Sequence, residues 1–193
     1  MEFIQASQLP FDPRPQMSRI FVEGFYLWIN HFQKDKERLA EAFTHTFLLE
    51  HFWIAAEGDV VAAMAACTNG YAPVRLNQEI FMEKLGTVRG FLTYRRLKRN
   101  MTRHGYPFLL TPTTGSIEYV ATAPRFQRQG LGEGLIKHVM ESNNYEAFVL
   151  EVADTNNTAR RLYERLGFKE FARRRALDRR RTGVNYFLYM RRS

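Results

Sequence analysis

The chain has 193 residues, 45% of them hydrophobic and 14% aromatic, which is enough to bury the core of one domain. Its single cysteine, Cys67, excludes an internal disulfide and favours a reducing compartment, and its place in an apolar run predicts a buried side chain. The net charge of +8 favours anionic partners, but nucleic acid, an acidic protein and a phosphate-bearing cofactor satisfy it equally.

The N-terminus has no basic stretch followed by an apolar one, as a secretion signal would. The longest apolar run, Val60 to Cys67, is too short to cross a bilayer. Together these features predict a cytoplasmic protein.

The first 67 residues predict a strand, two helices and a β-hairpin. The expected elements are a strand over 2–6, a helix over 18–30, a helix starting at Asp35, and hairpin strands 51–56 and 60–67. The second helix follows from the capping aspartate and from Leu39, Ala42, Phe43 and Phe47 at helical spacing. His45 and His51 lie close in sequence, but a metal site needs a further ligand and none stands nearby, so no metal is expected.

About forty residues, 69–114, then separate the hairpin from the next strand. Helical patterns over 77–84 and 88–101 are interrupted at Gly86, and Gly90 is a second candidate break. The second pattern places Phe91, Leu92, Tyr94 and Leu97 among Arg89, Arg95, Arg96, Lys98, Arg99 and Arg103. Connections of this length are often functional lids, and a solvated basic helix packed by its aromatic side is the alternative.

The stretch 116–133 is predicted to run from a strand, through a glycine-containing loop, into a helix. Strand alternation places Ile117, Tyr119 and Ala121 on one face and Glu118, Val120 and Thr122 on the other. Pro124 lacks an N–H and ends the strand.

Gly130 and Gly132 open the helix that follows, where the backbone can approach a ligand closely. The first N–H groups of a helix have no partner within it and carry partial positive charge, which suits a phosphate. The spacing is neither that of a dinucleotide-binding loop nor that of a P-loop, and a tight turn without a ligand is the alternative.

The apolar run 147–153 predicts a strand buried on both faces of a partly parallel sheet, reached by a right-handed crossover. A helix is expected to begin at Asn156 or Asn157 and to end at Gly167. A last hairpin, 169–176 with 184–191, carries an arginine-rich loop over 173–181 whose role the sequence leaves open. The simplest interpretation is that these arginines form a charged sheet edge, which prevents pairing with other sheets. Nucleic-acid binding is the alternative.

Two strings resemble the signatures of the GNAT N-acetyltransferases. Gln127-Arg-Gln-Gly130-Leu-Gly132 resembles the acyl-CoA signature, with Thr122 standing where the family usually has valine. The run Asn156-x-x-Ala159-x-x-Leu162-Tyr163-x-x-x-Gly167-Phe168 is similar to the second signature without a mismatch. The resemblance is strong over 116–173 and rests on element order elsewhere.

This resemblance implies the GNAT acyl-CoA N-acyltransferase fold of the α/β class. The expected architecture is a mixed central sheet with splayed parallel central strands, helices on both faces, and a helical insert before the fourth strand. The whole chain, 1–193, is then a single acetyltransferase domain with its insert at about 69–114.

The resemblance also implies acetyl-CoA as the co-substrate, without a metal. The pantetheine would pair with the strand backbone and the pyrophosphate would meet the N–H groups of 128–133. The cofactor-binding residues are then expected to be Val120, Ala121, Thr122, Gln127, Arg128, Gln129, Gly130, Leu131, Gly132, Glu133 and Asn156.

The implied reaction is direct acetyl transfer to a primary amine of a small molecule or peptide. The amine must lose a proton, and a carboxylate is the natural base. Glu118 is preferred, while Glu151 is the alternative because N-terminal-protein acetyltransferases of this family carry a functional glutamate there; many relatives keep that glutamate for structural reasons. Tyr163 is the expected general acid, with core packing as its alternative role.

Two other function classes stay open, a non-catalytic acyl-CoA-binding or regulatory module and, less favoured, a nucleic-acid-binding protein. The sequence does not identify the acceptor amine, nor does it decide whether the chain forms a homodimer.

Overall fold

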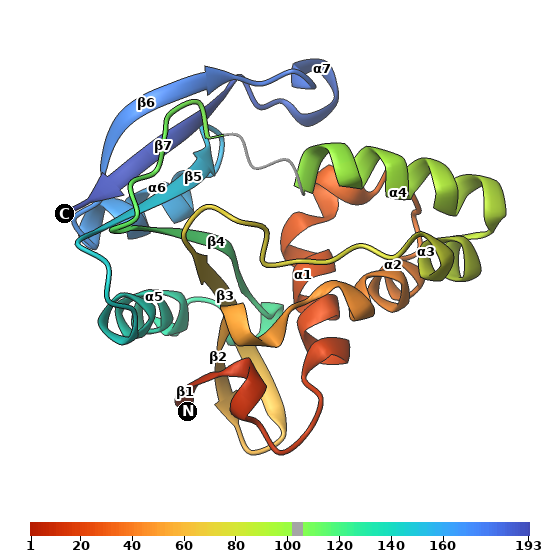
Figure 1. Ribbon diagram of the computed structural model, residues 1–193, viewed down its shortest axis with the longest axis horizontal. Coiled ribbons are helices and arrows are strands. Elements are labelled where there is room, and N and C mark those ends of the chain that lie inside the picture. Colours follow the sequence, from red (N-terminus) through yellow and green to blue (C-terminus); the bar gives the residue numbers. More distant parts are fainter. Residues whose placement is uncertain (102–105) are drawn as a thin grey trace.

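The computed structural model describes residues 1–101 and 106–193, so Arg103 of the predicted basic helix lies outside the described residues. A seven-stranded sheet forms the centre, in the order β1-β2-β3-β4-β5-β7-β6 (Figure 1). Strands β4 and β5 pair in parallel and the other neighbours are antiparallel. The strands are β1 Glu2–Gln5, β2 Phe52–Glu57, β3 Val60–Thr68, β4 Thr114–Thr122, β5 Ala147–Ala153, β6 Lys169–Arg175 and β7 Tyr186–Arg192.

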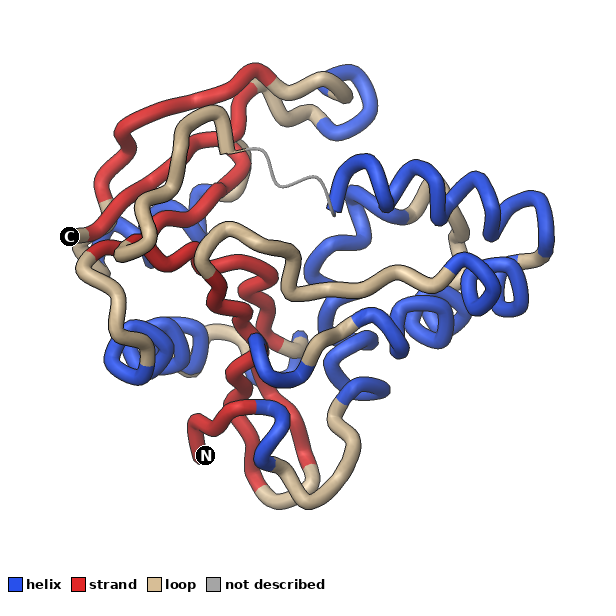
Figure 2. Tube along the Cα trace, viewed as in Figure 1, coloured by secondary structure: helices blue, strands red, loops and turns tan. Residues whose placement is uncertain are grey.

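Helices cover both faces of this sheet (Figure 2). They are α1 Arg14–Ile29, α2 Lys36–Phe43, α3 Gln78–Leu85, α4 Thr87–Met101, α5 Leu131–Ser142, α6 Asn157–Arg165 and the short α7 Arg179–Thr182. Side chains of α1 and α2 pack on one face, and those of α5 and α6 pack on the other. The predicted fold class is confirmed, including the helical insert before the fourth strand. Every helix within 1–101 and 106–193 is too short or too polar to span a membrane.

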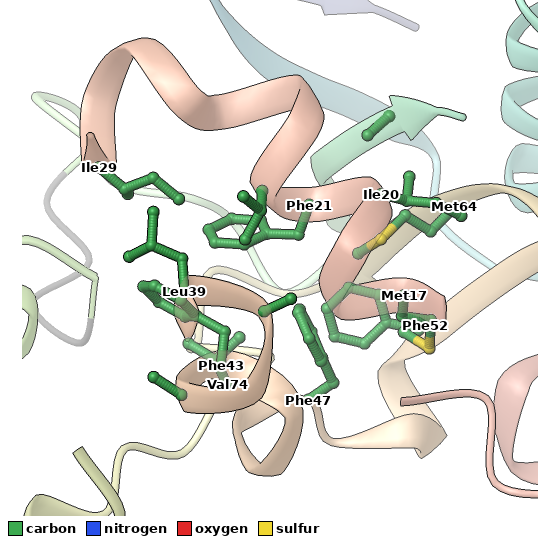
Figure 3. Close-up of a cluster of buried hydrophobic side chains, with 14 of the residues drawn as sticks. Met17, Ile20, Phe21, Ile29, Leu39, Phe43, Phe47, Phe52, Met64 and Val74 are labelled. Atoms are coloured by element: carbon green, nitrogen blue, oxygen red, sulfur yellow. The ribbon is translucent and has the colours of Figure 1, made fainter. Parts of the chain in front are cut away.

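The core on the α1 side is rich in aromatic rings (Figure 3). The ring centroids of Phe21 and Phe43 are 5.0 Å apart, and those of Phe47 and Phe52 are 5.4 Å apart. Phe81 of α3 and Leu97 of α4 belong to the same buried cluster. The insert is therefore part of the main core, and burial of each such side chain stabilises the fold by roughly 1.5–3 kcal/mol.

Gly86 and Gly90 of the insert have different roles. Gly86 ends α3 with a φ of +86°, as predicted for a break. Gly90 lies inside α4, so the expectation of a second break there is wrong. A Cβ at Gly90 would come within 2.2 Å of the Phe81 carbonyl oxygen, so the glycine allows α3 and α4 to cross closely.

Three other predicted boundaries shift. The first helix begins at Arg14 because a proline is tolerated in a first turn. The second helix ends at Phe43, and Phe47 lies beyond it. The arginine-rich segment 173–181 is not one loop, because its first residues lie in β6 and its last ones in α7.

Strand β4 contains a bulge. Glu118 lies opposite Ala66 of β3, and Ala121 lies opposite Met64, so β4 has one residue more than its partner over this interval. The extra residue is accommodated at Tyr119, which has a φ of +54°. This left-handed conformation is uncommon for residues other than glycine.

The bulge changes which side chains share a face. Val120 packs with Ile117 on the α5 side, whereas Glu118 lies opposite a residue of the α1-side cluster. The prediction that Glu118 shares a face with Val120 and Thr122 is therefore wrong, since one added residue reverses the alternation. The prediction that Ile117 shares a face with Tyr119 and Ala121 is wrong for the same reason.

Candidate active site

The two parallel strands part at their C-terminal ends. Their pairing runs from Thr114 opposite Ala147 to Ile117 opposite Leu150 and then stops, although both strands continue. The next residues are Glu118 on β4 and Glu151 on β5. The predicted splay is confirmed, and it places both candidate bases where the strands separate.

Glu118 has the electrostatics of a base that works near neutral pH. Its carboxylate is half-buried, and Oε1 accepts a hydrogen bond from the Tyr106 hydroxyl at 3.2 Å. Burial raises the pKa of Glu118 to about 7; the Tyr106 hydrogen bond acts in the opposite direction, and the charge of Glu151 raises the pKa further. A carboxylate with this pKa can accept a proton at physiological pH and release it again.

Tyr106 lies in the insert, after its two helices, and the sequence did not indicate it. Its ring lies 5.2 Å from that of Phe108 and 5.8 Å from that of Tyr189, measured between centroids. Burial and the nearby glutamates raise the pKa of Tyr106 above its usual range, so the phenol stays a donor. A single tyrosine in an irregular segment carries no periodic signal, so the sequence could not link it to Glu118.

Glu151 has a different environment. Its side chain is 36% exposed, and Oε2 lies 3.5 Å from Nη2 of Arg174 on β6. Burial raises the pKa of Glu151, while Tyr189 and Arg174 lower it. Tyr189, which lies opposite Glu151 on β7, is itself almost fully buried. Because Glu151 is engaged by an arginine, the geometry favours Glu118 as the base.

Tyr163 lies on α6 in the hydrophobic cluster that also contains Ile117 and Leu150. Its side chain is almost fully buried, with its ring centroid 6.1 Å from that of Phe168. Burial raises the pKa of Tyr163 to about 12, so the phenol is neutral at physiological pH. It is therefore in the protonated form that a general acid requires.

The loop after β4 has an open backbone. Gly130 precedes the first residue of α5 with a φ of +77°, and Arg128 has a φ of +62°. A Cβ at Gly130 would meet open space, whereas one at Gly132 would lie 3.7 Å from Thr122 Oγ1. Over the described residues, no side chain caps the start of α5, so its first N–H groups are available to an anion.

The polar side chains of this loop mostly hold the loop itself. Gln127 Nε2 donates to the Thr122 carbonyl and Gln129 Nε2 to the Arg125 carbonyl, each at 3.2 Å. Any contact of these glutamines with a phosphate is therefore expected to use their backbone N–H groups.

Glu133 and Asn156 also have local partners. The Glu133 carboxylate is bound by Lys137 at 3.0 Å and Arg165 at 3.3 Å, and these hydrogen bonds lower its pKa. Asn156 caps α6, since its Oδ1 accepts from the Ala159 N–H at 3.1 Å. The predicted start of this helix is confirmed, and Gly167 follows its end with a φ of +86°.

Cys67 and His45 have structural environments. Cys67 is buried, and burial together with the charge of Glu118 raises the pKa of its thiol to about 12. A protonated thiol is a poor nucleophile, so this residue gives no support for an acyl-cysteine step. His45 Nε2 accepts the backbone N–H of Asn77 at 3.0 Å, which ties the insert to the end of α2.

Residues 15–168 match the acetyltransferase (GNAT) family, and the chain belongs to this family. In a more particular comparison, it is 42% identical over 59 residues to the [ribosomal protein bS18]-alanine N-acetyltransferase of Escherichia coli K12. That match covers 29% of this chain and 40% of the relative, so the chain spans less than half the length of the curated relatives it matches.

Solved structures share the whole fold at low identity. An N-acetyltransferase from Staphylococcus aureus Mu50 is 15% identical with a TM-score of 0.63, and the match covers 100% of both chains. A ribosomal-protein-alanine N-acetyltransferase from Brucella melitensis is 12% identical with a TM-score of 0.62, covering 100% of this chain and 99% of that one. At these identities the likeness shows the fold alone.

Proposed function

We propose that this protein transfers an acetyl group from acetyl-CoA directly to a primary amine of a small molecule or peptide. The observation that carries the proposal is Glu118, a carboxylate at the point where β4 and β5 part, with its pKa raised to about 7. Membership of the acetyltransferase family supports the same reaction.

The residues present fit acetyl-CoA. The backbone of Arg128, Gly130 and Gly132 leaves a cradle at the start of α5 for a pyrophosphate, and exposed Arg125 adds positive charge beside it. Beyond Ile117, the edge of β4 is unpaired toward β5, and an extended pantetheine can pair with the backbone of 120–122 there. Bound in this way, acetyl-CoA supplies an activated acyl group.

Glu118 is then the base and Tyr163 the acid. Glu118 accepts the proton that the attacking amine releases as its nitrogen bonds to the acyl carbon. The C–S bond breaks, and Tyr163 donates its phenolic proton to the sulfur, so that the products are the amide and free CoA. The cycle closes when protonated Glu118 and the Tyr163 phenolate exchange a proton through solvent, which returns them to carboxylate and phenol.

Alignment of the amine and the thioester is expected to provide most of the rate enhancement, up to roughly 7–11 kcal/mol. Tyr106 holds Glu118 through its hydrogen bond and lowers the carboxylate pKa toward the working range. We therefore assign Tyr106 as a positioning residue.

The test is a thermal-shift titration with acetyl-CoA, followed by an amine screen read as CoA release. A ligand at 100 times its dissociation constant stabilises the fold by about 2.7 kcal/mol, so the midpoint should rise clearly. The partial match to an alanine N-acetyltransferase recommends peptide α-amines for the screen, beside lysine, polyamines and aminoglycosides. No shift at millimolar acetyl-CoA would contradict the proposal.

Binding of acetyl-CoA without CoA release for any amine would favour the non-catalytic acyl-CoA-binding class. A steep fall of nucleic-acid binding with salt would favour the nucleic-acid class. A cytoplasmic location stays a prediction from the sequence.

A further inference from the structure

A second concave site lies beside the C-terminal hairpin. This arginine cleft has a volume of about 810 Å³ and is bounded by the end of α1, by α4 and by the segment 177–185 that contains α7. In Figure 1, α7 extends from the β6–β7 hairpin toward α4. The charged and titratable residues that line the cleft are His31, Arg96, Asp178, Arg179, Arg180 and Arg181.

Asp178 and Arg181 together link three elements around this cleft. Asp178 Oδ2 lies 3.2 Å from Arg96 Nη2 on α4 and 3.0 Å from Arg181 Nη2 on α7. Arg181 Nη1 also donates to the Leu27 carbonyl of α1 at 3.3 Å and lies 3.0 Å from His31 Nδ1. The hairpin, the insert and α1 are therefore linked by charged hydrogen bonds, which fix the cleft walls.

The cleft has more cations than the protein neutralises. Arg179 donates through Nε and Nη2 to Asn185 Oδ1, a neutral acceptor, at 3.1 and 2.7 Å. Within the described residues, Arg180 makes no ion pair. Burial and the charges of Arg181 and Arg96 lower the pKa of His31, so it adds no charge at neutral pH.

Four guanidinium groups therefore face one carboxylate in the arginine cleft. Asp178 serves Arg96 and Arg181, so Arg179 and Arg180 have no carboxylate partner within the described residues, and an entering anion would be attracted to both. Guanidinium forks match carboxylates in geometry and bind them by paired hydrogen bonds.

The cleft adjoins the candidate active site through the same hairpin. Strand β7 pairs with β5 so that Tyr189 lies opposite Glu151 and Phe187 lies opposite Ala153. Asn185, which lines the cleft, donates its backbone N–H to Asp154 Oδ1 at 3.1 Å, directly after β5. The wall of the cleft is therefore continuous with the end of β5, the strand that carries Glu151.

We propose that the arginine cleft binds the acidic side chains of a peptide acceptor whose amine is acetylated at Glu118; the proposal rests on the proposed function and names its substrate class. A peptide fits better than nucleic acid for two reasons. The described residues that line the cleft include no Phe, Tyr or Trp, and their one aromatic ring, that of His31, is engaged by Arg181 Nη1, so a base has little to stack on. Its volume also suits a few side chains rather than an extended strand.

The test measures fluorescence anisotropy of a labelled peptide that carries four glutamates after a free N-terminal alanine. A second peptide has glutamines in their place. The double variant Arg179→Gln with Arg180→Gln is compared with a matched control, Arg19→Gln with Arg75→Gln, which removes two exposed arginines elsewhere. Acetyl-CoA thermal shifts verify that each variant is folded.

We expect the native protein to bind the glutamate peptide at least tenfold more tightly than the glutamine peptide, with affinity that falls as salt rises. The cleft variant should lose this preference and the control should keep it. In the CoA-release assay, kcat/KM for the glutamate peptide should fall about tenfold in the cleft variant, with the glutamine peptide unchanged.

Equal binding of both peptides by the native protein would overturn the proposal, and so would an unchanged preference in the cleft variant. Tighter binding of a single-stranded RNA of similar length, lost in the same variant, would also overturn it. Peptide binding at the cleft without CoA release would contradict the enzymatic proposal alone and leave the ligand chemistry of the cleft standing.

Discussion

The Tyr106 hydroxyl donates a hydrogen bond to Glu118 Oε1 at 3.2 Å and joins the last part of the insert to the bulged centre of β4. This contact stabilises the charged form of a carboxylate that burial would otherwise keep protonated to a higher pH. The insert thereby affects the chemistry of a residue on the central strand.

Tyr106→Phe should shift the acidic limb of the pH–rate profile to higher pH. The change removes a hydrogen bond that lowers the pKa of Glu118, so a larger fraction of the carboxyl is protonated at neutral pH. The measurement is kcat/KM against pH with the best acceptor. Tyr26→Phe is the matched control, because it removes a hydroxyl bond to the Lys34 carbonyl in the α1–α2 connection. An unmoved limb would show that Tyr106 has only a packing role.

Glu118→Gln should lower turnover by about 10²-fold or more and remove the acidic limb. The same change in Glu151 should leave the limb in place, because Glu151 is paired with Arg174. Loss of the acidic limb of the pH–rate profile in the Glu151 variant alone would identify Glu151 of β5 as the base. If both variants keep it, the amine loses its proton to solvent.

Glu118 should also affect stability in a pH-dependent way. The folded pKa of about 7 lies above the usual value of 4.5, so the group stabilises the fold fully below about pH 4.5, and this contribution is lost as pH rises through 7. Relative to the native protein, Glu118→Gln should therefore gain stability between pH 5 and pH 8, by at most about 3 kcal/mol. Urea unfolding at both pH values measures this, with the exposed Glu141→Gln as control. A difference independent of pH would contradict the raised pKa.

Gly130→Asp should abolish the melting-temperature rise caused by acetyl-CoA. An aspartate there would face the proposed pyrophosphate and would also be strained by the φ of +77°. Gly58→Asp controls for strain, because Gly58 also has a positive φ and open space for a Cβ but lies in the β2–β3 turn. A full acetyl-CoA shift in the Gly130 variant would argue against the α5 start as the phosphate site.

Tyr163→Phe should lower kcat by about 10²-fold and leave acetyl-CoA affinity nearly unchanged, since the proton is given only in the transition state. Rate assays and thermal-shift titrations separate the two effects. Unchanged kcat would assign Tyr163 to packing in the cluster with Phe168.

Phe81→Ala should destabilise the protein by about 3–5 kcal/mol, because the ring is fully buried in the α1-side core. Leu92→Ala, at an exposed position on α4, should change stability by less than about 0.5 kcal/mol. Denaturant midpoints compare the two variants. Equal small effects would mean that the insert is a separate lid, and in that case deletion of 69–114 would be tolerated.

Local signals in the sequence were sufficient for much of this protein. The glycine loop at Gly130 and the Asn156 cap depend on backbone groups within a few residues, so their patterns predict them directly. The hairpin turn at Gly58 and the helix end at Gly86 are local in the same sense. The parting of β4 and β5 was expected from the resemblance and is confirmed by the pairing that stops at Ile117.

The tertiary structure decided what depends on contacts between distant residues. The bulge at Tyr119 places Glu118 on the opposite face of the sheet from the one predicted. No residue type in 116–122 indicates that the strand contains an added residue. The pairing of Tyr106 with Glu118 and of Arg96 with Asp178 joins segments whose separation in sequence carries no pattern. Such pairs depend on how the sheet and the insert pack, and therefore only the folded chain shows that Tyr106 contacts Glu118, that Arg174 contacts Glu151, and which arginines share a cleft.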